Sequence, residues 1–163
     1  MAQQAVADIG LIGLAVMGEN FALNIADHGY KVAVYNRTTD TMKKFVAREN
    51  PPGGLVGCET VKDLIAAIKK PRKVIILVKA GPVVDAVVKE LIAAGAERDD
   101  IIIDCGNSLF TDTIRREREY AEQCKFFGSG ISGQSARPSR RRRCPSRRTC
   151  TARHIRARGE SCR

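Results

Sequence analysis

The 163-residue sequence contains no run that approaches the roughly 18 consecutive apolar residues of a membrane-spanning helix. We also expect no signal peptide, because the N-terminus MAQQAVAD lacks a basic stretch and the first apolar run is short. These two absences argue against a membrane protein and against a secreted one. We therefore expect a cytoplasmic protein that has no membrane partner.

The cysteines lack any pattern of paired ligands. Six of them are scattered along the chain, and without a secretory signal we expect free thiols in a reducing compartment. Cys144, Cys150, His154 and Cys162 lie close together in the sequence, but their spacing matches none of the common zinc-ligand patterns. We expect no metal site.

Net charge is absent from most of the chain. The sequence has 28 basic and 18 acidic side chains, which gives a formal net charge of +10. Residues 134–163 hold 11 arginines and one glutamate, so residues 1–133 keep 17 basic and 17 acidic side chains. The first 133 residues therefore give no electrostatic reason to expect binding to nucleic acid or to a membrane.

Residues 134–163 also lack the apolar side chains that a core requires. Ile155 is their only large aliphatic residue, and they contain no aromatic residue. Such a segment buries too little surface to offset the entropy that ordering costs, so we predict a disordered, arginine-rich tail over 134–163. Its six arginines between Arg140 and Arg148 are typical of nucleic-acid-binding arms, and we expect nonspecific binding to polyanions.

The first 133 residues alternate between apolar strands and amphipathic helices. Strand-like segments lie at 7–12, 31–35, 73–78, 100–105 and 125–127. Helix-like segments lie at 17–28, 39–48, 60–69, 83–93 and 111–123, and PPGG at 51–54 indicates a loop. Strands that are apolar throughout and alternate with helices predict an α/β fold, in which a doubly wound parallel sheet is covered on both faces.

A glycine-rich turn follows the first strand. In GLIGLAVMGEN, residues 10–20, Gly13, Ala15 and Gly18 occupy the three positions of a G-x-G-x-x-G pattern, with alanine in the middle. Gly13 permits the tight turn, the small Ala15 lets the backbone approach a pyrophosphate, and Gly18 lets the helix pack closely on the strand. The helix that begins here offers free N–H groups and partial positive charge to phosphates. The pattern therefore predicts a Rossmann-type dinucleotide site.

The end of the second strand indicates which dinucleotide is bound. Folds that bind NAD usually place an acidic residue there for the ribose hydroxyls, whereas this strand ends in NRTTD. Arg37 is able to pair with a 2′-phosphate and to stack on the adenine, and Asn36 and Thr38 offer hydrogen bonds. Asp40 falls late for a contact with the ribose. We therefore predict NADP rather than NAD as the cofactor.

Five motifs together make a more specific match than any one of them. They are GLAVMGEN at 13–20, NRT at 36–38, LVKAG at 77–81, DCGNS at 104–108 and GSGISG at 128–133. In this order and spacing they resemble the N-terminal domain of the 6-phosphogluconate dehydrogenase family over about residues 6–133. The resemblance implies an NADP-dependent oxidoreductase of the pentose phosphate pathway and of gluconate utilisation, which decarboxylates 6-phosphogluconate to ribulose 5-phosphate.

The resemblance also implies the residues that contact the cofactor. Those of the glycine-rich turn, against the pyrophosphate, are Gly13, Leu14, Ala15, Val16, Met17 and Gly18. Those that hold the adenosine 2′-phosphate are Asn36, Arg37 and Thr38, and those beside the ribose and nicotinamide are Val78, Lys79 and Ala80. Asn107 contacts both cofactor and substrate, while Ser132 and Gly133 begin the loop that binds the substrate. In the family the protein is a homodimer, but the domain that forms the dimer is absent from this sequence.

The sequence departs from the family at two places. Cys105 stands where the family motif has glycine, which leaves Asn107 in position. From Gln134 onward the match stops, and the arginine-rich segment replaces the acidic, glycine-rich continuation of the family. We therefore expect 1–133 to be a truncated Rossmann domain and 134–163 to be a frameshifted or mis-spliced end, with a dedicated nucleic-acid-binding arm as the alternative.

The residues for catalysis are missing as well. The family uses a lysine as general base and a glutamate as general acid, both beyond the first domain, so we assign no catalytic residue here. The sequence has no lysine after Lys125, and its only later carboxylate side chain is Glu160. We expect the chain alone to be inactive and to offer 6-phosphogluconate an incomplete pocket. The alternatives are an NAD-dependent β-hydroxyacid dehydrogenase of the 3-hydroxyisobutyrate type and a dinucleotide-binding module with a basic arm.

Overall fold

A computed structural model describes residues 6–131. Its six strands are β1 (Ile9–Ile12), β2 (Val32–Tyr35), β3 (Leu55–Cys58), β4 (Lys73–Ile76), β5 (Ile101–Asp104) and β6 (Lys125–Gly128). The helices between them are α1 (Val16–Asp27), α2 (Thr39–Arg48), α3 (Val61–Ala67), α4 (Pro82–Ala93) and α5 (Phe110–Tyr120). All strand pairs are parallel, and the strand order is β3-β2-β1-β4-β5-β6. This order confirms the predicted Rossmann-type, doubly wound α/β fold.

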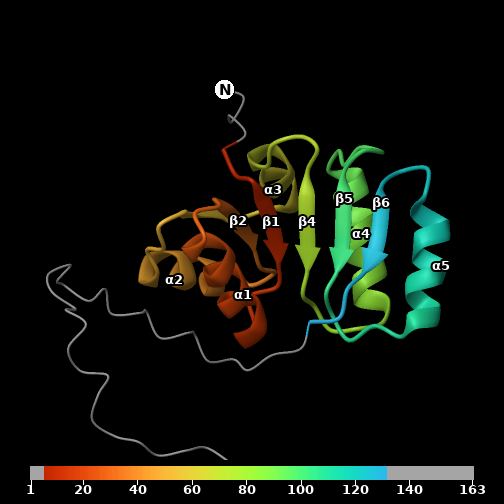
Figure 1. Cartoon of the computed structure of the whole chain (residues 1–163), viewed down its shortest axis with the longest axis horizontal. Helices are drawn as coiled ribbons and strands as arrows, with labels where there is room; N and C mark the ends of the chain where they lie inside the picture. The colour runs from red at the N-terminus through yellow and green to blue at the C-terminus, as the bar shows by residue number, and fades with distance from the viewer. Residues whose placement is uncertain (1–5, 132–163) are drawn as a thin grey trace, which may run out of the picture.

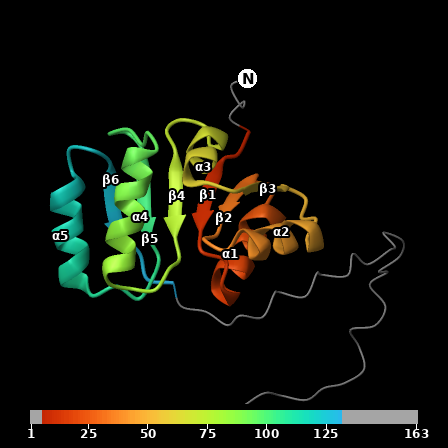
Figure 2. The same cartoon turned by 180° about the vertical axis from the view of Figure 1, so that it is seen from behind.

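The helices cover both faces of the sheet and form two separate hydrophobic cores. One core joins α1 and α2 to the sheet through Leu11, Val32 and Val34. The other joins α3, α4 and α5 to it through the alternate strand positions, such as Ile12 and Ala33. Figure 1 views the sheet with α4 behind it, and Figure 2 shows α4 in front. Because successive residues of a strand face opposite sides, strands between two helical layers need apolar side chains on both faces.

One strand of the sheet lies where the sequence interpretation placed none. β3 follows the PPGG loop and pairs with β2 along its whole length, at the edge of the sheet. Its sequence is LVGC, and only Cys58 is buried. A strand this short, with a glycine inside it and one exposed edge, lacks the continuous apolar run that reveals the central strands.

Several predicted boundaries are too long by a few residues. The helix predicted over 60–69 ends at Ala67, because Ile68 is extended and forms a parallel bridge with Ala7. Its start agrees with the sequence, since Thr60 caps it in a capping box with Asp63. The strand predicted over 73–78 ends at Ile76, and the helix predicted over 111–123 ends at Tyr120.

The topology defines where a ligand binds. Neighbouring strands β1 and β4 lie on either side of the point at which the strand order reverses, and the arrowheads of β1, β4, β5 and β6 in Figure 1 point to the same edge. In open parallel sheets this carboxyl edge, at the reversal point, is the usual binding crevice. Among residues 6–131, no helix is long and apolar enough to cross a bilayer.

Candidate functional site

The turn after β1 has a backbone that only glycine accommodates at its first position. Gly13 has φ of +101°, and its N–H donates to the Tyr35 carbonyl at 3.0 Å. A Cβ atom at this position would lie 2.2 Å from the carbonyl oxygen of Leu77, in the loop after β4. Both the left-handed φ and the close approach of two backbone segments therefore require glycine. The role predicted for Gly13 has this geometric basis.

Gly18 keeps α1 in contact with the same turn. A Cβ atom on Gly18 would lie 1.9 Å from the Gly13 carbonyl oxygen. Ala15 is the N-cap of α1 and makes no side-chain capping bond, so no protein side chain caps the helix from that position. The first N–H groups of a helix have no intrahelical acceptor, and here they begin at the reversal point of the sheet. This arrangement fits the pyrophosphate of a dinucleotide.

Asn36 holds the turn to the end of β2 through both ends of its amide. Its Oδ1 accepts the Leu14 N–H at 3.1 Å, and its Nδ2 donates to the Thr38 carbonyl at 3.2 Å. The Leu14 side chain is buried in the core beneath α1. Leu14 and Asn36 were both predicted to contact the cofactor. Their hydrogen bonds show that they also stabilise the conformation of the turn.

Arg37 and Thr38 lie where β2 leads into α2. Both side chains are exposed, and Thr38 is the N-cap of α2 but makes no side-chain capping bond. The ten-residue helix α2 directs the positive end of its dipole toward this point, which also carries the Arg37 cation. Asp40 belongs to the first turn of α2. The positive end of the α2 dipole and the Arg37 cation thus lie beside the Thr38 hydroxyl, which makes no capping bond. This combination is suited to binding a phosphate.

A cleft of about 160 Å³ opens at the carboxyl edge, between the loops that follow β1, β4, β5 and β6. Its lining residues are Ala15, Met17, Gly18, Leu77, Val78, Cys105, Gly106, Asn107 and Ile131. A larger hollow of about 640 Å³, lined partly by Tyr30 and Pro71, lies at the opposite edge, where the strands begin. Parallel sheets bind ligands at the carboxyl edge, so position favours the smaller cleft despite its size.

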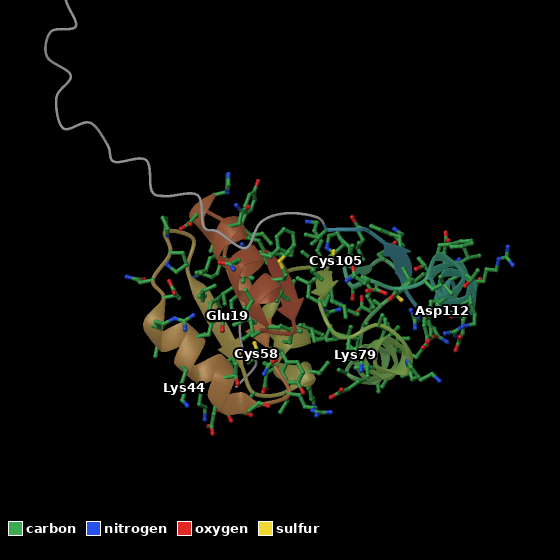
Figure 3. The ribbon with its side chains drawn as sticks, turned by 90° about the horizontal axis from the view of Figure 1, so that it is seen from below. Glu19, Lys44, Cys58, Lys79, Cys105 and Asp112 are labelled. Atoms are coloured by element: carbon green, nitrogen blue, oxygen red, sulfur yellow. The ribbon has the colours of Figure 1, made fainter. Side chains whose placement is uncertain are left out.

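The cleft brings together residues that are far apart in the sequence. Val78 and Asn107 line it, and Lys79 and Ala80 lie in the same loop as Val78. Figure 3 looks onto this edge of the sheet and labels Lys79 and Cys105, which come from the loops after β4 and β5. Lys79 and Asn107 are exposed. Ser132 and Gly133 lie outside the described residues, so their predicted contact with substrate stays a prediction.

Cys105 contributes a buried thiol to the floor of the cleft. Burial, with a smaller contribution from the Asp104 carboxylate, raises the pKa of Cys105 to about 11. At neutral pH the group is therefore a thiol and a weak nucleophile. Cys58 and Cys124 are also buried and free, and burial raises the pKa of each to about 11. Within residues 6–131, no group of His, Cys, Asp and Glu side chains is arranged to hold a metal ion.

An ion pair between a buried arginine and a partly buried aspartate, which the sequence interpretation missed, supports the loops behind the cleft. Arg116, on α5, has 1% of its side chain exposed and donates to Asp85 of α4 from Nε and Nη2, at 3.1 and 2.9 Å. Arg115 also donates to Asp85, from the surface. A bidentate arginine–carboxylate pair is among the stronger charge-assisted interactions, so it joins α4 firmly to α5.

The Asp85 carboxylate predicts a loss of stability in acid. Its hydrogen bonds from Arg116, and secondarily from Arg115, lower its pKa from 3.8 to about 2. Because the folded-state pKa lies below the unfolded one, the stabilisation is complete above about pH 4 and is lost as pH falls toward about 2. Urea titrations should show that the free energy of unfolding falls over that pH range by about 1 kcal/mol less in Asp85→Asn than in the wild type. An equal pH dependence in both proteins would contradict the assignment.

A glycine-requiring turn at the reversal point of a β3-β2-β1-β4-β5-β6 sheet defines a dinucleotide-binding domain of the Rossmann type. A sequence profile described as the NAD binding domain of 6-phosphogluconate dehydrogenase matches residues 8–140. The chain belongs to the 6-phosphogluconate dehydrogenase family, through its NAD(P)-binding domain.

Individual relatives agree with this membership. The chain is 50% identical over 131 residues to the decarboxylating 6-phosphogluconate dehydrogenase 2 of Saccharomyces cerevisiae, covering 80% of this chain and 26% of that one. It superposes on 6-phosphogluconate dehydrogenase of Plasmodium falciparum, studied with NADP+ and with 6-phosphogluconate, with a TM-score of 0.69 and 43% identity. That match covers 78% of this chain and 28% of the other. The chain thus spans about a quarter of the length of the curated relatives that it matches.

A more distant structure shares the fold alone. The 3-hydroxyisobutyrate dehydrogenase of Mycobacterium tuberculosis superposes with a TM-score of 0.66 at 19% identity, over 80% of this chain and 42% of that one. The alternative predicted from the sequence, an enzyme of the 3-hydroxyisobutyrate type, therefore has less sequence support than the family match. The boundary predicted at residue 133 and the tail at 134–163 lie outside the described residues.

Proposed function

We propose that this chain binds NADP at the carboxyl edge of its sheet and is the cofactor-binding part of a decarboxylating 6-phosphogluconate dehydrogenase. The observation that carries the proposal is the glycine turn, in which a Cβ atom at either Gly13 or Gly18 would strike backbone. Such a turn leaves room for a pyrophosphate to approach the start of α1. Family membership over residues 8–140 supports the same cofactor class.

The pyrophosphate would lie against the backbone from Gly13 to Gly18, and the nicotinamide would lie toward Val78 and Asn107, which line the cleft. The adenosine 2′-phosphate would lie beside Arg37 and Thr38, at the start of α2. That end of the site carries positive potential and has its first acidic side chain, Asp40, inside the helix. These features favour NADP over NAD, because NAD lacks the 2′-phosphate that would use the positive charge.

When bound, the cofactor supplies a hydride acceptor for the oxidation of C3 of 6-phosphogluconate, after which the 3-keto product loses carbon dioxide. The chain's own part is to orient the cofactor and to exclude water from the floor of the cleft, where the buried Cys105 and the partly buried Leu77 lie. Asn107 is exposed at the mouth, in reach of both cofactor and substrate by our proposal. The general base and general acid that the reaction needs have no candidate among the residues assigned here.

The proposal predicts binding without turnover. In calorimetric titrations the purified chain should bind NADP at least about tenfold more tightly than NAD. Mixed with NADP and 6-phosphogluconate, it should form no NADPH above a heat-killed control, as followed by absorbance. Equal affinity for NAD and NADP would overturn the cofactor assignment, and turnover would overturn the assignment of catalysis to residues outside this chain.

Localisation and the basic segment stay predictions. The free, buried Cys58, Cys105 and Cys124 support a reducing compartment such as the cytoplasm. A nucleic-acid-binding role for 134–163, the runner-up prediction, concerns residues outside the described part. Deleting 134–163 and measuring the salt dependence of RNA affinity would test that role separately from NADP binding.

A further inference from the structure

Arg116 is a fully buried cation in a helix whose sequence, FTDTIRREREY, reads as a charged surface helix. Removing a guanidinium from water is costly, so a buried arginine persists only when its N–H groups are well partnered. Nε and Nη2 donate to the Asp85 carboxylate. That pair alone would be enough to join α4 to α5, yet the guanidinium makes further contacts toward the cleft.

One of these contacts reaches the loop after β4. Nη2 of Arg116 also donates to the carbonyl oxygen of Gly81 at 2.9 Å. Gly81 is the N-cap of α4 and has φ of +105°, a conformation that glycine tolerates and other residues rarely adopt. The contact therefore anchors the end of the 77–81 loop, of which Leu77 and Val78 line the cleft.

The other contacts reach the loop after β5. Nη1 of Arg116 lies 3.4 Å from Ser108 Oγ and 3.7 Å from Asp104 Oδ2. The buried Asp104 carboxylate accepts the Ser108 hydroxyl at 2.6 Å and the Gly106 N–H at 3.0 Å. The turn that presents Asn107 is thus closed by Asp104, and Arg116 holds it from behind.

We propose that Arg116 is a positioning residue for the dinucleotide, which sets the separation of the 77–81 and 105–108 loops on the nicotinamide side of the cleft. The inference rests on the proposed function, because it assigns that side to the nicotinamide. A rigid, planar fork with five N–H donors suits a link among three segments, whereas a lysine offers a single flexible ammonium. Arg116 itself does not line the cleft.

The test compares Arg116→Lys with Arg115→Met, a control on the same helix. Arg115 also pairs with Asp85, but its other partner is Glu119 and its contacts do not include the cleft loops. Two ligands are titrated by calorimetry: NADP, and adenosine 2′,5′-bisphosphate, which carries the 2′-phosphate but no nicotinamide. We expect Arg116→Lys to bind NADP about tenfold more weakly while its affinity for the bisphosphate stays within about twofold. Arg115→Met should bind both ligands as the wild type does.

Amide hydrogen exchange supplies a second readout, in which Arg116→Lys should exchange faster at 77–81 and 105–108 than at α1 or α2. An equal loss of affinity for both ligands, or no loss for either, would overturn the inference and leave the proposed function standing. A wild-type chain that binds neither ligand would overturn the proposed function as well. If Arg116→Lys does not fold, Ser108→Ala replaces it, since that variant removes the contact of Arg116 with Ser108, together with the Ser108–Asp104 hydrogen bond, and keeps the Asp85 pair. Unchanged NADP affinity in Ser108→Ala would count against the inference.

Discussion

Replacing Gly18 with valine is expected to weaken NADP binding by roughly 100-fold and to destabilise the fold. Gly18 lies in α1, and even the first carbon of a side chain there would lie 1.9 Å from the Gly13 carbonyl oxygen. The obstructing atom is backbone, so no side-chain rotation relieves the contact. The helix must move away from the turn, and the N–H groups at its start move with it.

The sign of the effect of Gly18→Ala separates this explanation from ordinary helix energetics. In an unobstructed helix, glycine to alanine stabilises by about 1 kcal/mol. Here the overlap with backbone should outweigh that gain, and we expect Gly18→Ala to lose roughly 1–3 kcal/mol of unfolding free energy. Gly18→Val adds two methyl groups and should lose more. If Gly18→Ala were more stable than the wild type, α1 would not lie as close to the turn as described.

Urea unfolding and NADP titration on the same samples provide the measurements. We expect NADP affinity to fall by roughly 100-fold in Gly18→Val, since the loss of one or two charge-assisted hydrogen bonds from helix N–H groups to the pyrophosphate costs about 3 kcal/mol. Gly130→Ala is the matched control, because a Cβ atom at Gly130 would meet no heavy atom within 4 Å. It should change unfolding free energy by less than about 0.5 kcal/mol.

The central sheet and the glycine turn could be predicted from sequence because their signals are local. KVIILV and DIIIDC contain the apolar runs VIILV and III, which are typical of strands buried on both faces. The turn is defined by Gly13, which has a left-handed φ, and by Gly18, which approaches the Gly13 carbonyl, and both requirements lie within one short segment. Motif order along the chain then indicated the family. Each of these features is visible without knowing which segments pack together.

The features that were missed depend on tertiary contacts. β3 is stabilised by pairing with β2, which its LVGC sequence does not reveal. The pair of the buried Arg116 and the partly buried Asp85 joins helices that are separated by a whole strand, and nothing in either helix identifies the partner. One signal was available: Arg116 and Tyr120 are four residues apart on one helical face, and both are buried. An arginine and a tyrosine at this spacing in a charged helix indicate the face that packs against the rest of the domain.

Replacing Arg37 with methionine is expected to remove most of the preference for NADP. Arg37 is exposed beside the start of α2, and within the described part of the chain no neighbouring carboxylate neutralises its charge. The first acidic residue after it, Asp40, lies within the helix. A charge-assisted contact with a 2′-phosphate is worth about 2 kcal/mol, which corresponds to about 30-fold in affinity. NAD has no such phosphate, so its affinity should stay within about twofold.

The control is Lys44→Met, which removes one positive charge from α2, the helix that follows Arg37. Lys44 is exposed on α2, where Figure 3 labels it at the outer surface of the domain. If the long-range charge of the chain attracted NADP, both variants would weaken it alike and the loss would fade with added salt. A loss confined to Arg37→Met and to NADP assigns the effect to direct contact. Equal losses for NAD and NADP in Arg37→Met would instead indicate that the side chain stacks on the adenine that both dinucleotides share, and the preference for NADP would then need another source.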